Sequence, residues 1–183
     1  MSPAGTGEDI LIGLGSNLAL PRIGPPRAVL EAALADLAAR GIGLSARSRW
    51  YESAPVPVSD QPWFVNGVAL LDTDLPPDRL LAELHAVERA FGRQRRVVNE
   101  ARPLDLDLLA YGGRVAEGPE PPLLPHPRLA QRAFVLLPLA ELRPHWRHPA
   151  TGMGIAALIA ALPADQVARP IAGQATPGQV APG

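Results

Sequence analysis

Several short segments of the chain have a pattern of apolar and polar residues that is typical of β-strands. Continuous apolar runs typical of buried strands occupy residues 10–15 and 64–71. Loose alternation with the aromatic residues Trp50 and Tyr51 occupies 42–52, and clearer alternation of apolar and polar residues occupies 104–111. These four segments are the predicted strands.

Between the predicted strands lie two segments with apolar residues three and four positions apart, the spacing of an amphipathic helix. They occupy residues 27–40 and 76–91, and Gly41 and Gly92 end them. The order strand, helix, strand, strand, helix, strand predicts an α+β fold of the ferredoxin-like class. We therefore expect a mostly antiparallel sheet packed with helices in α-β-α layers.

The second half of the chain is less regular. Residues 119–127 contain five prolines and predict an irregular loop. Residues 128–142 predict a helix that Pro138 kinks or divides, because proline lacks the backbone N–H that an interior helical position needs. Residues 151–162 predict a last short helix.

One domain of residues 10–163 is expected, because 183 residues fall in the usual range for one domain. Residues 1–9 are predicted to be a flexible tail. Residues 164–183 are rich in proline, glycine and alanine, and they predict a disordered tail.

The amino-acid composition excludes several classes of function for this chain. Apolar residues make up 47% and charged residues 19%, which suits a globular core. The absence of cysteine excludes disulfides and thiolate chemistry, and the absence of lysine excludes a P-loop lysine. A net charge of −1 argues against nucleic acid as a partner, and no apolar run is long enough to cross a membrane. We expect a cytoplasmic monomer.

Asp105 and Asp107 are the most informative pair of residues. On a strand, positions two apart face the same side, so both carboxylates should share one face while the leucines between them enter the core. Two adjacent carboxylates with substrate phosphates suit Mg²⁺. The alternative is an amphipathic strand whose acidic face is merely solvated.

The segment before this strand carries Arg93, Arg95, Arg96 and Arg102. Guanidinium groups bind phosphate oxygens in a bidentate manner, so an acidic strand beside a basic loop could hold a polyphosphate. The alternative for these arginines is a solvated loop that pairs with Glu100 and surface acids.

Five further residues are candidates. His85 and Glu88, three apart on the second helix, could face the same basic loop, or they form a surface pair. His126 lies in a proline-rich loop, where a histidine is ordinarily structural or solvated. Phe64 and Asn66, two apart on a strand, could present a ring and an amide to one ligand, although a strand phenylalanine is most often part of the core.

Taken together, these segments resemble the 6-hydroxymethyl-7,8-dihydropterin pyrophosphokinase family, collinearly from about residue 10 to 158. The matching segments are Gly15-Ser16-Asn17-Leu18, Tyr51-Glu52-Ser53-Ala54-Pro55, Asp60-Gln61-Pro62 with Asn66, Glu88 with Gly92-Arg93, Arg102-x-Leu104-Asp105-Leu106-Asp107, Pro125-His126-Pro127-Arg128 and 132–139. The resemblance implies ATP-dependent transfer of pyrophosphate to the hydroxymethyl group of the pterin, with release of AMP, in folate biosynthesis.

The resemblance also implies roles for individual residues. It assigns two Mg²⁺ ions to Asp105 and Asp107, which with Arg93 and Arg102 form the expected catalytic set. The expected ATP-binding residues are His85, Glu88, Arg95, Arg102, His126 and Arg132. The expected pterin-binding residues are Ser53, Ala54, Val56, Phe64, Asn66 and Phe134, with the two phenylalanine rings stacked on the pterin.

One departure from the family pattern lies beside Arg102. Family members commonly have Gly-Pro before this arginine and Thr after it, whereas this chain has Glu100-Ala101 before it and Pro103 after it. This bears on loop geometry and turnover rather than on the metal pair. Two alternatives stay open: a Mg²⁺-dependent transferase acting on another small alcohol, and a nucleotide-binding regulatory module without activity.

Overall fold

The computed structural model describes residues 8–92 and 101–175. Its sheet and helices follow one another in the order β1 Ile10–Ser16, α1 Pro26–Ala39, β2 Gly43–Arg47, β3 Tyr51–Ser53, β4 Phe64–Asp72, α2 Pro77–Ala90, β5 Asp105–Tyr111, η1 Leu129–Gln131, α3 Ala133–Leu142, α4 Ile155–Ala160 and β6 Ala168–Pro170. No described helix is long and apolar enough to cross a membrane.

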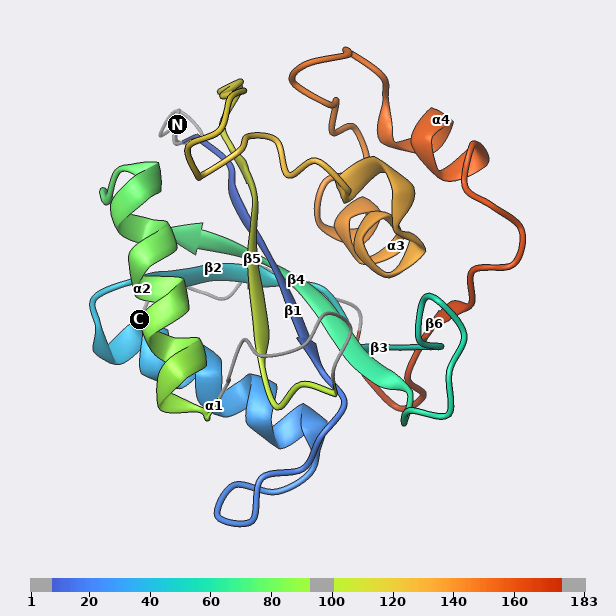
Figure 1. Cartoon of the computed structure of the whole chain (residues 1–183). Coiled ribbons are helices and arrows are strands. Elements are labelled where there is room, and N and C mark those ends of the chain that lie inside the picture. The colour runs from blue at the N-terminus through green and yellow to red at the C-terminus, as the bar shows by residue number, and fades with distance from the viewer. Residues whose placement is uncertain (1–7, 93–100, 176–183) are drawn as a thin grey trace.

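The six described strands form one sheet in the order β5-β1-β4-β3-β6, with β2 beside β3 on the same edge of β4. Every pairing between these strands is antiparallel. Helices α1 and α2 cover one face, and α3 and α4 lie against the other (Figure 1). The predicted ferredoxin-like α+β class is confirmed.

Alternation along β1 divides the core into two parts. Ile10, Ile12 and Leu14 pack with α1 and α2. Leu11, on the opposite face, packs with α3 and α4. Glu141 fastens α3 to the sheet, because it accepts hydrogen bonds from the Tyr51 hydroxyl (2.5 Å) and from the side chain of Arg49 (2.9 Å).

Helices α3 and α4 cover only part of the second face. They pack on Leu11, Leu70 and Leu109. Farther along the same strands this face carries Gly15, Asn66 and Asp105, which border an open cavity instead. The fold thus leaves one end of a sheet face available for a ligand.

The outer side of β5 is occupied by side chains and loop backbone. The Leu106 N–H donates to the Glu88 carboxylate of α2 (2.8 Å), and the Leu109 carbonyl accepts from the His126 N–H (2.8 Å). These contacts tie α2 and the proline-rich loop to the terminal strand of the described sheet.

Two predicted elements differ from the structure in their interior. Residues 42–52 form two strands, β2 and β3, separated by a break at residues 48–50. The predicted helix 128–142 is divided at Arg132, whose backbone is extended, and not at Pro138. Pro138 lies inside a continuous α3, because burial of that helix against the sheet outweighs the one hydrogen bond that proline removes.

The predicted boundaries of the tails are also wrong in part. Residues 168–170, expected to be disordered, form β6 and pair with β3. In the expected N-terminal tail, Asp9 pairs with Arg143 (2.9 Å). The composition of this C-terminal segment, rich in proline, glycine and alanine, did not prevent order, because the free edge of β3 offered backbone hydrogen bonds to residues 168–170. Residues 1–7 and 176–183 lie outside the described part of the chain.

Candidate active site

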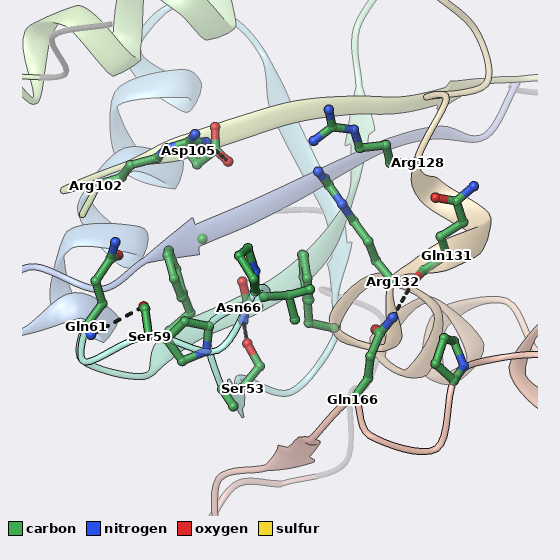
Figure 2. Close-up of a pocket in the computed structure, with 18 of the residues that line it drawn as sticks. Ser53, Ser59, Gln61, Asn66, Arg102, Asp105, Arg128, Gln131, Arg132 and Gln166 are labelled. Atoms are coloured by element: carbon green, nitrogen blue, oxygen red, sulfur yellow. Dashed lines mark hydrogen bonds and ion pairs between the residues drawn. The ribbon is translucent and has the colours of Figure 1, made fainter. Parts of the chain in front are cut away.

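A cavity of about 630 Å³ lies over the uncovered end of the sheet (Figure 2). Its floor comes from β1, β3, β4 and β5, and its walls come from the segment 54–61, from the η1–α3 junction and from residues 161–166. The lining residues that the sequence predicted for the site are Ser53, Ala54, Val56, Phe64, Asn66, Arg102, Asp105, Arg132 and Phe134.

Asn66 and Ser53 form the buried polar end of this cavity. Their exposed fractions are 4% and 2%, and the Asn66 Nδ2 donates to the Ser53 Oγ at 2.5 Å. Gly15 lies opposite Asn66 on β1, where an added Cβ would lie 3.0 Å from the Asn66 Oδ1. The amide is therefore fixed in orientation, and the glycine leaves room for its oxygen.

Phe64 and Phe134 line the same cavity from β4 and α3. Both rings are partly exposed, unlike the fully buried side chains of the two core clusters. An apolar ring surface beside a fixed amide suits a flat heterocycle with a polar edge.

Asp105 and Asp107 extend from the cavity face of β5, while Leu104, Leu106 and Leu108 are buried on the other face. Their neighbours on β1 are Gly15 and Gly13, which carry no side chains to cover them. Each carboxylate contacts an arginine: Arg102 Nη1 lies 3.1 Å from Asp105 Oδ2, and Arg132 Nη1 lies 3.4 Å from Asp107 Oδ2.

The described residues contain no group of three or more histidine or acidic side chains placed to hold a metal ion. Two carboxylates on one face fit Mg²⁺, which takes one or two carboxylates and completes its shell with water and phosphate oxygens. The flanking arginines fit the phosphates. The donor set therefore suits a metal that arrives with a nucleotide.

Asn17 connects two walls of the cavity. Its Oδ1 accepts from the Arg102 N–H (2.8 Å), its own N–H donates to the Arg102 carbonyl (3.1 Å), and its Nδ2 donates to the Gln61 Oε1 (3.2 Å). This buried side chain therefore fixes the backbone of Arg102. Asn17 belongs to the segment Gly15-Ser16-Asn17-Leu18, which resembles the family, but the sequence predicted no role for it.

His126 lies close to Arg128 and Arg132. Its Nδ1 accepts from the Arg128 N–H at 3.1 Å. The pKa of its imidazole is lowered to about 4, chiefly by burial and also by the charges of Arg132 and Arg128, against the opposing effect of Asp105. The imidazole is neutral near pH 7. Burial also lowers the pKa of Arg132, against the opposing effect of Asp107.

Several predicted residues do not line the cavity. Glu88, which the resemblance assigns to ATP binding, is 2% exposed, and its carboxylate accepts from the Leu106 N–H of β5. His85 lies half-buried on α2, outside the cavity lining. Arg93, Arg95 and Arg96 lie outside the described residues.

Other lining residues were not predicted. They include Pro57, Ser59, Gln61, Arg128, Gln131, Pro163 and Gln166. Arg128 and Gln61 belong to motifs that carried the family resemblance, so a signal for them existed. Gln166 had none, because it lies in a segment that was expected to be disordered.

An α+β fold with paired carboxylates, flanking arginines and an adjoining cavity of about 630 Å³ has the features of an enzyme that transfers a phosphoryl group to a small molecule. A family model described as 7,8-dihydro-6-hydroxymethylpterin-pyrophosphokinase matches residues 11–144. The chain belongs to this family, whose activity is pyrophosphoryl transfer to hydroxymethyldihydropterin in folate biosynthesis.

The chain is also similar to individual proteins with related descriptions. A 2-amino-4-hydroxy-6-hydroxymethyldihydropteridine pyrophosphokinase of Pseudomonas aeruginosa is 43% identical over 88% of this chain and 96% of its own length. One of Synechocystis sp. is 41% identical over 81% of this chain and 73% of its own length. The folic acid synthesis protein fol1 of Pneumocystis carinii is 38% identical, and there the chain spans only 19% of the longer relative.

Proposed function

We propose that the protein transfers a pyrophosphoryl group from ATP to 6-hydroxymethyl-7,8-dihydropterin in the described cavity. One observation carries this proposal. Gly15 pairs with Asn66 on one side and with Asp105 on the other, so the amide and the carboxylate lie on the same face two strands apart. Two strand spacings are roughly 10 Å, which leaves room between them for a small alcohol and a phosphate chain.

The pterin occupies the end of the cavity that contains Asn66. Phe64 and Phe134 supply ring surface, and the Asn66 amide, held by Ser53, meets the polar edge of the heterocycle. The backbone and side chains of Ala54 and Val56 border the same end. Stacking supplies affinity, and the fixed amide supplies discrimination between flat rings.

The triphosphate lies along the face of β5 that carries Asp105, which lines the cavity, and Asp107, and two Mg²⁺ ions are the expected complement. Bound there, the metal supplies charge neutralisation and alignment of the phosphates. Arg102 and Arg132, which contact the two carboxylates, are placed to bind phosphate oxygens. We expect neutral His126 to bind the nucleotide without adding charge, and we expect Arg93 and Arg95, outside the described residues, to bind its phosphates.

The reaction is an in-line displacement. The hydroxymethyl oxygen forms a bond to the β-phosphorus and releases its proton to solvent, the bond from this phosphorus to the bridging oxygen of the α-phosphate breaks, and AMP leaves. The protein positions both reactants and stabilises the charge on the transferred group, with Arg102 and Arg132 nearest to it. No covalent enzyme intermediate is required.

An assay of AMP release tests this function. The purified protein should release AMP from Mg²⁺–ATP only when the hydroxymethyl pterin is present. Release with other small alcohols but not with the pterin would favour a transferase of different specificity. Nucleotide binding without release would favour a regulatory module.

Oligomeric state and location extend this proposal. We propose that the protein is a monomer and that it is located in the cytoplasm. Light scattering of the purified protein tests the first expectation, and fractionation of the source cells tests the second.

A further inference from the structure

The C-terminal segment of the described chain forms one wall of the cavity. Ala161, Pro163 and Gln166 line it, although the family model matches only residues 11–144. The segment is anchored on the strand that carries Ser53, because β6 pairs with β3 and the Ala54 N–H donates to the Val167 carbonyl (3.2 Å). This wall therefore has a defined place relative to the site.

Gln166 bonds to the backbone on both sides of Arg132. Its Oε1 accepts from the Ala133 N–H at 2.8 Å, and its Nε2 donates to the Gln131 carbonyl at 2.7 Å. Figure 2 shows its side chain reaching from the C-terminal wall to this junction. One amide thus holds the residue before Arg132 and the residue after it.

The junction needs such a contact for a physical reason. Arg132 is the N-cap of α3, its backbone is extended (φ −119°, ψ 112°), and its own side chain does not cap the helix. The first N–H groups of a helix have no partner within the helix and require an acceptor from elsewhere. Gln166, 33 residues away, supplies that acceptor for Ala133.

The position of Arg132 bears directly on the site. Its guanidinium lies 3.4 Å from the Asp107 carboxylate, and its Cζ lies 5.5 Å from the centre of the Phe134 ring. A rotation of the Arg132 backbone would move the guanidinium away from both. The side chain that fixes this backbone therefore governs where the guanidinium points.

We propose that Gln166 is a positioning residue for nucleotide binding, which holds Arg132 where the phosphates of ATP meet the carboxylates of β5. The inference rests on the proposed function, because it takes Arg132 as a phosphate-binding residue. It also assigns a role in the reaction to the C-terminal wall.

The test compares Gln166→Met with Gln174→Met. Methionine keeps the length of glutamine and removes both hydrogen bonds. Gln174 is a matched control, because it fastens the same C-terminal segment to Trp50 (2.7 and 2.9 Å) and to Ile171 (2.8 Å) but does not line the cavity.

We expect Gln166→Met to raise the KM for ATP and the Kd of a non-hydrolysable ATP analogue roughly fivefold or more, the effect of one or two lost hydrogen bonds. The KM for the pterin should change less. Gln174→Met should lower the melting temperature and leave the KM for ATP within about twofold of the original value. Equal changes in both variants would overturn the positioning role and leave only a structural one.

A double-mutant cycle with Arg132→Ala separates this inference from the proposed function. If Gln166 acts through Arg132, Gln166→Met should add little to the loss caused by Arg132→Ala. Fully additive losses, or a silent Gln166→Met beside a damaging Arg132→Ala, would overturn the role of Gln166 alone. A silent Arg132→Ala would overturn the phosphate role of Arg132 and the role of Gln166 with it.

Discussion

At the scale of single residues, the two β5 carboxylates lie on the same face of the strand, and each pairs with an arginine. Arg102 contacts Asp105 and Arg132 contacts Asp107, and all four side chains are partly exposed. Pairs of this kind contribute little to stability, about 0–1 kcal/mol each. Their contribution to a bound polyphosphate should be much larger, because both signs of charge are already fixed in place.

Asp105→Asn and Asp107→Asn should therefore lower kcat roughly a hundredfold or more while changing the melting temperature little. AMP release under saturating substrates measures the first effect, and a thermal melt measures the second. Asp36→Asn is the matched control, because Asp36 also pairs with an arginine, Arg40, but lies on α1 far from the cavity lining. Full activity in either β5 variant would refute the metal assignment.

Asn66→Ala should weaken pterin binding and spare ATP binding. The buried amide is fixed by Ser53, and a ligand group that loses its partner there costs about 1–3 kcal/mol. Calorimetry with the pterin and with an ATP analogue would measure both affinities. Parallel loss of both affinities with a fall in melting temperature would instead indicate a purely structural asparagine.

His126 should make the stability of the protein depend on pH. Burial lowers the pKa of its imidazole from 6.5 to about 4, with Arg132 and Arg128 acting in the same direction. Between these two values the unfolded chain binds more protons than the folded protein. The free energy of unfolding should therefore fall as the pH decreases through this window.

His126→Gln should reduce that dependence, as urea denaturation at about pH 7.5 and about pH 5 would measure. His148→Gln is the comparison, because burial also lowers the pKa of His148, though by less. An unchanged pH slope in His126→Gln would show that this imidazole titrates normally in the folded protein.

At the scale of elements, the side chain of Glu88 joins α2 to β5. The spacing of His85 and Glu88 on α2 allowed either a surface pair or a group facing the basic segment, and the family resemblance assigned Glu88 to ATP binding. In the structure the Glu88 carboxylate accepts a hydrogen bond from the Leu106 N–H of β5. The linear pattern gave no sign of that tertiary contact.

Glu88→Ala should lower the free energy of unfolding by about 1–3 kcal/mol, because it leaves a backbone donor without its acceptor. The KM for ATP should stay close to its original value in the variant that remains folded. Urea denaturation and steady-state kinetics measure the two effects. Glu83→Ala, which removes an exposed pair with Arg40 on the same helix, should change stability by less than about 1 kcal/mol.

The two predicted helices of the first half were found within one residue of their predicted ends, and the reason is local. Both begin at proline pairs and end at glycines with positive φ, Gly41 and Gly92. The division of residues 128–142 was not predictable in the same way. It follows from the extended backbone of Arg132, which a side chain 33 residues away helps to hold.

At the scale of the whole molecule, alternation and helical spacing were enough to predict the fold class. They also predicted that Asp105 and Asp107 share a face, because a strand dictates that geometry. The gathering of Asn66 and Asp105 around Gly15 required the strand order, which no local pattern contains. The C-terminal wall was missed because its composition resembles that of a disordered segment, while its order depends on the free edge of β3.

The outer side of β5 has one more consequence. A terminal strand exposes a row of N–H and C=O groups that can pair with a strand of another molecule, the usual start of β-aggregation. Here the Glu88 carboxylate and the His126 N–H occupy two of those groups. Glu88→Ala should therefore promote self-association as well as unfolding, seen as concentration-dependent light scattering below the melting temperature. A Glu88→Ala protein that stays monodisperse at high concentration would show that the remaining contacts suffice to block this strand.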